Sequence, residues 1–64
     1  MTQEQQRTLD AMIAADEKFQ TAIIKQFGKS KAYMRYHSAK HNAETQSAAS
    51  AFHKAVEVYR ACFR

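Results

Sequence analysis

The 64-residue sequence has no proline and no tryptophan, and it has a single glycine, Gly28. Proline and glycine are the residues that most strongly interrupt helices. Their scarcity leaves Phe27-Gly28-Lys29-Ser30 as the segment where helical patterning must stop, because glycine closes a helix C-terminus and Ser30 can cap the next helix. We therefore predict an all-α antiparallel helical hairpin with its turn at residues 28–29.

Cysteine is almost absent as well. One cysteine, Cys62, excludes an internal disulfide, and a single unpaired thiol suits a reducing cytoplasm. A folded chain of this size hides only about 60% of the surface that its unfolded form exposes. Small domains without disulfides usually depend on a metal or on oligomerisation. The sequence therefore predicts one helical domain over residues 1–64 that self-associates, as a homodimer.

Long apolar runs are missing from the chain. No run approaches the ~20 residues that a membrane span needs, and residues 1–6 are too polar to resemble a signal peptide. We expect a cytoplasmic protein with no membrane partner.

The first half of the chain carries a clear helical pattern. Thr2 and Gln5 have the spacing of a capping box, which opens a helix. Apolar residues then recur every three or four positions, and this period predicts a helix over about 3–27. The apolar stripe is interrupted at Asp16, and its members are Leu9, Met12, Ile13, Phe19, Ile23, Ile24 and Phe27.

The second half lacks any strong helix breaker. Alanine is abundant after Ser30, and this composition favours one long helix over about 31–63. Asn42 is the residue at which that helix could end and a further helix could be capped. A three-helix bundle with a break near Asn42 is therefore the alternative fold.

A turn at residues 28–29 fixes which residues of the two helices face each other. Asp16 then lies opposite His41, and we expect the two to form a polar layer. Polar residues of the first helix face the apolar end of the second, which is left without a partner in the chain. We predict that this end dimerises, with an association surface made of Ala48, Phe52, Ala55, Val56, Tyr59, Cys62 and Phe63.

Negative charge is absent from the middle of the chain. The formal net charge is +4, and residues 18–43 contain lysine and arginine but no acidic residue. Cations contact phosphates and tyrosines stack on unpaired bases, so this composition is typical of a nucleic-acid-binding face. An acidic protein partner would be attracted by the same charge. The predicted binding residues are Lys25, Lys29, Lys31, Tyr33, Arg35, Tyr36 and Lys40.

Few residues suggest reaction chemistry. His37, His41 and Glu44 share one helix face at i, i+4 and i+7, which is a weak candidate for a metal site because it lacks a full ligand set. Cys62 has no evident base beside it, and a thin helical hairpin leaves little room for a substrate pocket. We expect no catalytic residue, no metal and no cofactor.

Two functions remain open on this reading. The first is a small basic regulatory protein, without enzymatic activity, that binds RNA or DNA through the face around the turn. The alternative is a helical adaptor or inhibitor of the phage or plasmid type, which binds a host protein through the basic face or the apolar C-terminal helix.

Overall fold

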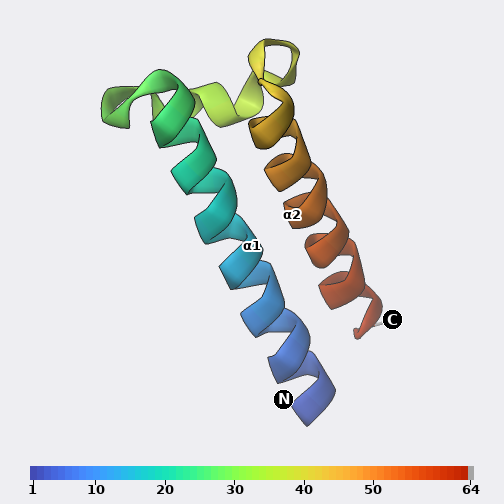
Figure 1. The fold of residues 1–64 in the computed structure, drawn as a ribbon. Coiled ribbons are helices and arrows are strands. Elements are labelled where there is room, and N and C mark those ends of the chain that lie inside the picture. Colours follow the sequence, from blue (N-terminus) through green and yellow to red (C-terminus); the bar gives the residue numbers. More distant parts are fainter. Residues whose placement is uncertain (64) are drawn as a thin grey trace.

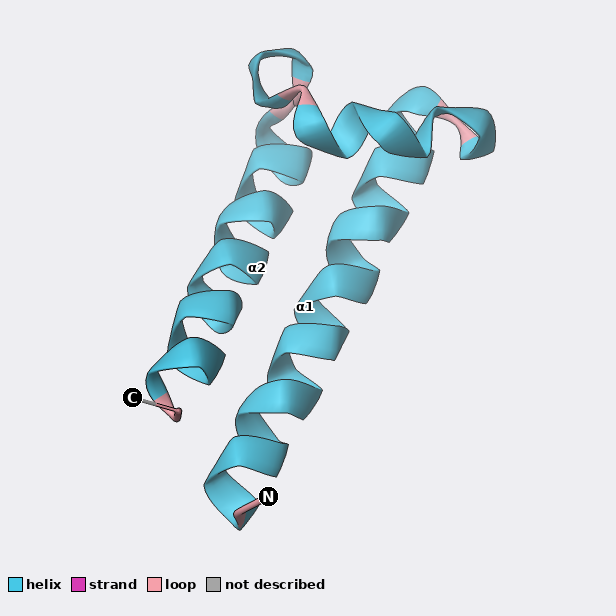
Figure 2. Ribbon diagram, turned by 180° about the vertical axis from the view of Figure 1, so that it is seen from behind, coloured by secondary structure: helices cyan, strands magenta, loops and turns pink. Residues whose placement is uncertain are grey.

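A computed structural model describes residues 1–63 of the chain. Two α-helices, α1 (Gln3–Phe27) and α2 (Ala43–Ala61), are linked by two 3₁₀ helices, η1 (Lys29–Tyr36) and η2 (Ser38–Lys40). The described part is helical apart from short turns and contains no strand, which confirms the predicted all-α class. In Figure 1, α1 and α2 run side by side, and the segment that links them lies across one end. We call residues 28–42 the connector; Figure 2 shows it from behind.

The predicted helix over 3–27 is confirmed as α1. Thr2 Oγ1 accepts a 3.1 Å hydrogen bond from the Gln5 amide, and Gln5 Oε1 accepts one of 2.9 Å from the Thr2 amide, so the capping box forms. The helix ends at Gly28, whose φ of 102° and ψ of 161° lie in a region that only glycine adopts readily. Gly28 therefore ends α1 and turns the chain into the connector.

The predicted continuous helix over 31–63 is wrong. The residues after Gly28 form 3₁₀ turns, and helical geometry is lost at His37, where φ is −112° and ψ is 68°. Ser30 lies inside η1, which has no side-chain cap. The α-helix starts again only after Asn42, whose side-chain oxygen accepts a 2.8 Å hydrogen bond from the Thr45 amide. The break that we gave as the alternative, near Asn42, is the one that the structure contains.

The core explains why the connector departs from a straight helix. Phe19 and Ile23 of α1 are buried together with Met34 of η1 and Ala49 of α2. His41 is also buried, at the end of the connector. A straight helix from residue 31 would carry Met34 and His41 along α2 and away from this cluster. Burial of apolar surface outweighs helix propensity, which amounts to less than about 1 kcal/mol per residue.

α1 and α2 pack antiparallel in a register that differs from the predicted one. The rings of Phe19 and Phe52 lie 6.0 Å apart between centroids, and Thr8 Oγ1 lies 3.6 Å from Cys62 Sγ. A turn at residues 28–29 alone would have placed Phe19 opposite Ser38. The connector takes up the residues in between, so α2 is displaced along α1 and Phe52 packs against the core.

α2 is amphipathic and rich in alanine rather than continuously apolar. Among residues 1–63, neither α1 nor α2 combines the length and the apolar character needed to cross a membrane.

Candidate functional site

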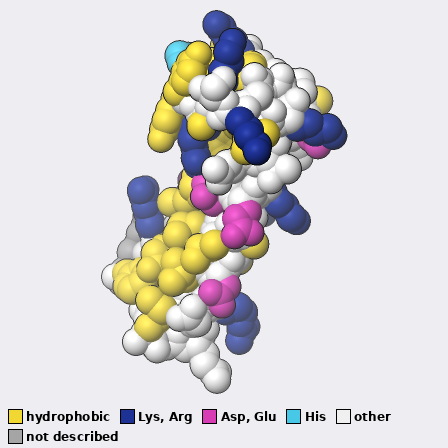
Figure 3. Space-filling view, turned by 90° about the vertical axis from the view of Figure 1, so that its left-hand side faces the viewer, with side chains coloured by type: hydrophobic (Ala, Val, Ile, Leu, Met, Phe, Trp, Pro, Cys, Tyr) yellow, Lys and Arg dark blue, Asp and Glu magenta, His cyan; other side chains and the backbone are white. Residues whose placement is uncertain are grey.

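The exposed cations and tyrosines of the connector form the candidate binding surface. Tyr36 is 81% exposed and Tyr33 is 55% exposed, which is unusual for large rings in a chain with so small a core. Lysines lie beside them on η1 and η2 and are likewise exposed. We call this set the connector surface; its members are Lys29, Lys31, Tyr33, Tyr36, His37 and Lys40. Figure 3 shows several Lys and Arg side chains around the end of the molecule that carries the connector.

The two tyrosines are held in different ways. The Tyr33 ring makes an edge contact with the His37 ring, with centroids 6.2 Å apart. Tyr36 is contacted from one side by the Arg35 guanidinium, which lies 5.9 Å from the ring centroid. Neither phenol makes a hydrogen bond within the described residues, and both side chains stay largely exposed despite these contacts.

Arg35, predicted as a binding residue, points into the structure instead. Its Nη2 donates a 2.7 Å hydrogen bond to Asp16 Oδ1, and the two side chains are 25% and 39% exposed. The guanidinium also lies 5.0 Å from the Phe19 centroid and 5.5 Å from that of Phe52. Arg35 therefore ties the connector to both α-helices, and its charge is already partly neutralised.

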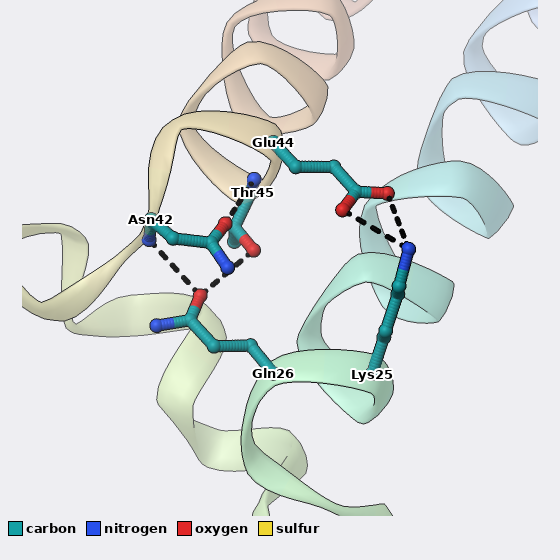
Figure 4. Close-up of polar contacts among 5 residues, drawn as sticks. All are labelled: Lys25, Gln26, Asn42, Glu44 and Thr45. Carbon is teal, nitrogen blue, oxygen red and sulfur yellow. Dashed lines mark hydrogen bonds and ion pairs between the residues drawn. The ribbon is translucent and has the colours of Figure 1, made fainter.

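Lys25, also predicted to bind, lies on α1 and not on the connector. Its ammonium group is 3.3 Å from a carboxylate oxygen of Glu44, and Figure 4 shows the pair bridging α1 and the first turn of α2. Both side chains are largely exposed, so the pair contributes little to stability. The pair does change the surface charge, because the carboxylate of Glu44 offsets the positive charge of Lys25 next to the connector.

Gln26 holds the fold together through hydrogen bonds, and sequence patterning did not identify it. Its Oε1 accepts hydrogen bonds from the Asn42 amide at 3.0 Å and from Thr45 Oγ1 at 2.8 Å. Its Nε2 donates to the Lys40 carbonyl at 2.8 Å. The first two of these bonds are visible in Figure 4. One side chain thus joins the last turn of α1 to the end of the connector, at Lys40 and Asn42, and to Thr45 in the first turn of α2.

The predicted polar layer of Asp16 and His41 does not form. Asp16 pairs with Arg35, whereas His41 Nε2 lies 2.9 Å from the Met34 carbonyl. A carbonyl only accepts, so Nε2 carries the proton and donates. The His41 ring makes an edge contact with Phe19 at 5.8 Å, and its Nδ1 is buried without a hydrogen-bond partner. The register shift that the connector imposes separates the two expected partners.

The three residues of the weak metal candidate do not lie together, because the helix that was expected to carry them is broken. His37 lies at the non-helical end of η1, His41 is buried against phenylalanine, and Glu44 lies on α2 beside Lys25. Within residues 1–63, no three His, Cys, Asp or Glu side chains come together in a way that could hold a metal ion.

The predicted association surface is split by the structure. Ala48 and Phe52 pack against the core of their own chain. Cys62 accepts a 3.1 Å hydrogen bond at its carbonyl from Gln5 Nε2, so it too is engaged within the chain. The remaining members are half-buried or, for Phe63, exposed; they are Ala55, Val56, Tyr59 and Phe63.

Small side chains line an open groove between α1 and α2, away from η1. Alanines dominate it, and Glu17, Lys18 and Glu44 are its charged members. The groove has a volume of about 1010 Å³ and is open to solvent. A smaller hollow lies where η2 meets α2, between His41 and His53. The smaller hollow contains Ser38 and Ser50 beside these histidines, but within residues 1–63 no serine hydroxyl is hydrogen-bonded to a histidine nitrogen.

Comparisons of this chain with protein-family models, with curated proteins and with solved structures found no match.

Proposed function

We propose that the protein binds nucleic acid through the connector surface and does so without catalysing a reaction. The observation that carries this proposal is the exposure of Tyr33 and Tyr36 among lysines on a segment that needs neither ring for its core. Large aromatic side chains lose apolar contacts when they are left in water, so two exposed rings beside cations favour a flat ligand with negative charge.

The charge on the connector supports a polyanionic ligand. Among the described residues, Lys29, Lys31 and Lys40 take part in no ion pair, whereas Lys25 and Arg35 are paired with acids. Three free cations near one end of an elongated chain can each contact a phosphate of one strand. Such contacts release condensed counterions and make binding sensitive to salt.

The tyrosines favour single strands over duplex. A base can stack on an exposed ring only when it is unpaired, and such stacking contributes about 1–3 kcal/mol per base. Tyr33 and Tyr36 lie three residues apart in a 3₁₀ helix, where positions i and i+3 lie on the same side. The two rings therefore offer neighbouring stacking positions, and we propose a single-stranded RNA or DNA ligand.

The test is a salt series with labelled single-stranded and duplex oligonucleotides, read by fluorescence anisotropy. We expect the logarithm of affinity to fall linearly with log salt, with a slope of about −2 for single strands if three phosphates are neutralised at about −0.7 each. Lys31→Glu should flatten that slope. Lys54→Glu is the matched control, because Lys54 is an exposed lysine on α2 outside the connector.

Tyr36→Ala separates stacking from charge. The substitution should weaken single-strand binding by about tenfold, in line with about 1–3 kcal/mol per stacked base, and leave the salt slope unchanged. The absence of any salt-sensitive binding at low ionic strength would contradict the proposal. It would favour an acidic protein partner, which gives one saturable complex and a shallower slope.

A further inference from the structure

The connector covers only part of one face of the α1–α2 pair. Arg35 marks where the cover ends, because it lies over Phe19 and Phe52 and pairs with Asp16. Beyond it, the side of α1 that bears Asp16 continues for more than three turns towards the N-terminus. The side of α2 that bears Phe52 continues towards the C-terminus. The chain is therefore stepped, with three elements at one end and two at the other.

The uncovered part of this face is apolar. Helix spacing places Ile13, Met12 and Leu9 three, four and seven residues before Asp16, on the same side of α1. Val56 and Tyr59 follow Phe52 at steps of four and three on α2, and Phe63 lies in the turn after α2 with its ring against Tyr59. We call this set the apolar half-face: Leu9, Met12, Ile13, Val56, Tyr59 and Phe63.

The apolar half-face is exposed and contiguous. Ile13 is 49% exposed and Phe63 is 55% exposed, and the other members are half-buried. The rings of Tyr59 and Phe63 make an edge contact with centroids 5.0 Å apart. Figure 3 shows hydrophobic side chains merging into one patch over the half of the molecule that lies away from the connector.

The total exposed surface is larger than that of an average monomer of this mass. The chain exposes 4804 Å², whereas a folded monomer of 7.3 kDa exposes about 4200 Å² on average. The excess is about 600 Å², which is as large as the smallest area that each partner contributes to a stable interface, about 600 Å².

We propose that a second copy of the chain covers the apolar half-face in an antiparallel, two-fold dimer. A parallel arrangement would stack one connector on the other and hold the two half-faces apart by the thickness of η1. In the antiparallel arrangement, the two copies overlap only through their uncovered halves, so the half-faces meet directly and the two connectors point away from each other. Such an interface is self-complementary, as a two-fold dimer requires.

This dimer is independent of the proposed binding function, because it uses the opposite end of the chain. It places the two connector surfaces at the two far ends of the assembly. A failure of nucleic-acid binding would therefore leave the dimer untouched, and a failure of the dimer would leave the connector surface unchanged.

Sedimentation equilibrium of Ile13→Glu and Val58→Glu tests the surface. Both positions are aliphatic and about equally exposed, at 49% and 47%, but Val58 lies two residues from Val56 and therefore on another side of α2. Wild type and Val58→Glu should sediment as dimers. Ile13→Glu should raise the dimer dissociation constant at least about tenfold, because it buries an unpaired charge twice per dimer.

Circular dichroism of the Ile13→Glu monomer should still show a folded helical chain. A wild type that stays monomeric at its highest soluble concentration overturns the proposal, as does an equal loss of dimer in both variants.

A distance measurement tests the orientation. Spin labels on Lys29→Cys, in a Cys62→Ser background, report the separation of the two connectors by pulsed electron resonance. The antiparallel dimer predicts a separation greater than the 37 Å length of one chain. A short separation means stacked connectors and overturns the antiparallel arrangement.

Discussion

Arg35 Nη2 lies 2.7 Å from Asp16 Oδ1, and this ion pair fastens the connector to α1. The guanidinium lies over Phe19 and Phe52 at the same time, so one side chain contacts both α-helices. A cation that sequence patterning assigned to ligand binding thus serves the fold. The consequence is that the charge of Arg35 and the charges of the neighbouring lysines should respond differently to mutation.

Replacing Arg35 should destabilise the protein much more than replacing a neighbouring lysine. Arg35→Ala should lower the free energy of unfolding by about 1.5–3 kcal/mol, because it removes a charge-assisted hydrogen bond and two cation–π contacts. Lys31→Ala should change it by less than about 0.5 kcal/mol, as for an exposed side chain. Urea unfolding followed by circular dichroism measures both. Equal effects would show that the inward position of Arg35 contributes nothing.

Gln26 should be the polar side chain of α1 that is least tolerant of truncation. Gln26→Ala should cost about 1–3 kcal/mol, because the buried Thr45 hydroxyl loses its acceptor, whereas the exposed Asn42 amide turns to water. Gln26→Glu keeps the acceptor oxygen and should cost less. Gln20→Ala, at an exposed position of the same helix, is the control and should be nearly neutral. A neutral Gln26→Ala would mean that water satisfies these groups.

Gly28→Ala should destabilise the chain through its backbone alone. A Cβ at this position would meet no atom within 4 Å, so no steric clash is expected. The φ of 102° is nevertheless strained for alanine, and the cost should be about 1–3 kcal/mol in thermal or urea unfolding. Ala32→Gly, on the exposed side of η1, provides a control for general changes in connector flexibility. A stability unchanged by Gly28→Ala would imply that the connector adopts another path.

Asn42 should behave as a helix N-cap and not as a residue within a continuous helix. Asn42→Ala should cost about 1 kcal/mol, whereas Asn42→Asp should preserve most of the stability, because aspartate also accepts from the Thr45 amide. In a continuous helix the order would reverse, since alanine is the better helix former. Chemical denaturation of the two variants distinguishes these outcomes.

Local signals were enough to predict some elements from the sequence. The Thr2–Gln5 capping box and the single glycine gave both ends of α1, since each acts over three or four residues. Asn42 and Thr45 carry the same kind of signal, and the alternative break rested on Asn42. The long helix over 31–63 was preferred because alanine-rich sequence without glycine or proline has high helix propensity. Helix propensity does not indicate which apolar residues elsewhere in the chain must be buried, and this burial decided the path of the connector.

The errors in the site follow from that one error in the fold. Asp16 and His41 were paired by a register that assumed a turn of two residues, and the longer connector removed that register. Arg35 could not have been recognised as inward, because its partners are distant in sequence. The exposed positions of Tyr33 and Lys31 agree with the predicted face; their role in binding stays a prediction.

The connector is fastened through few side chains, chiefly Met34, Arg35 and His41, while most of its other residues face solvent. The residues that hold the connector against the α-helices and the residues that are exposed for binding are thus different positions of one short segment. In a library that randomises residues 29–41, those three positions should accept few replacements, whereas substitutions at Lys29, Tyr33 or Lys40 should rarely disturb folding. Ligand preference could therefore drift or be engineered at this end of the chain without a compensating change in either α-helix.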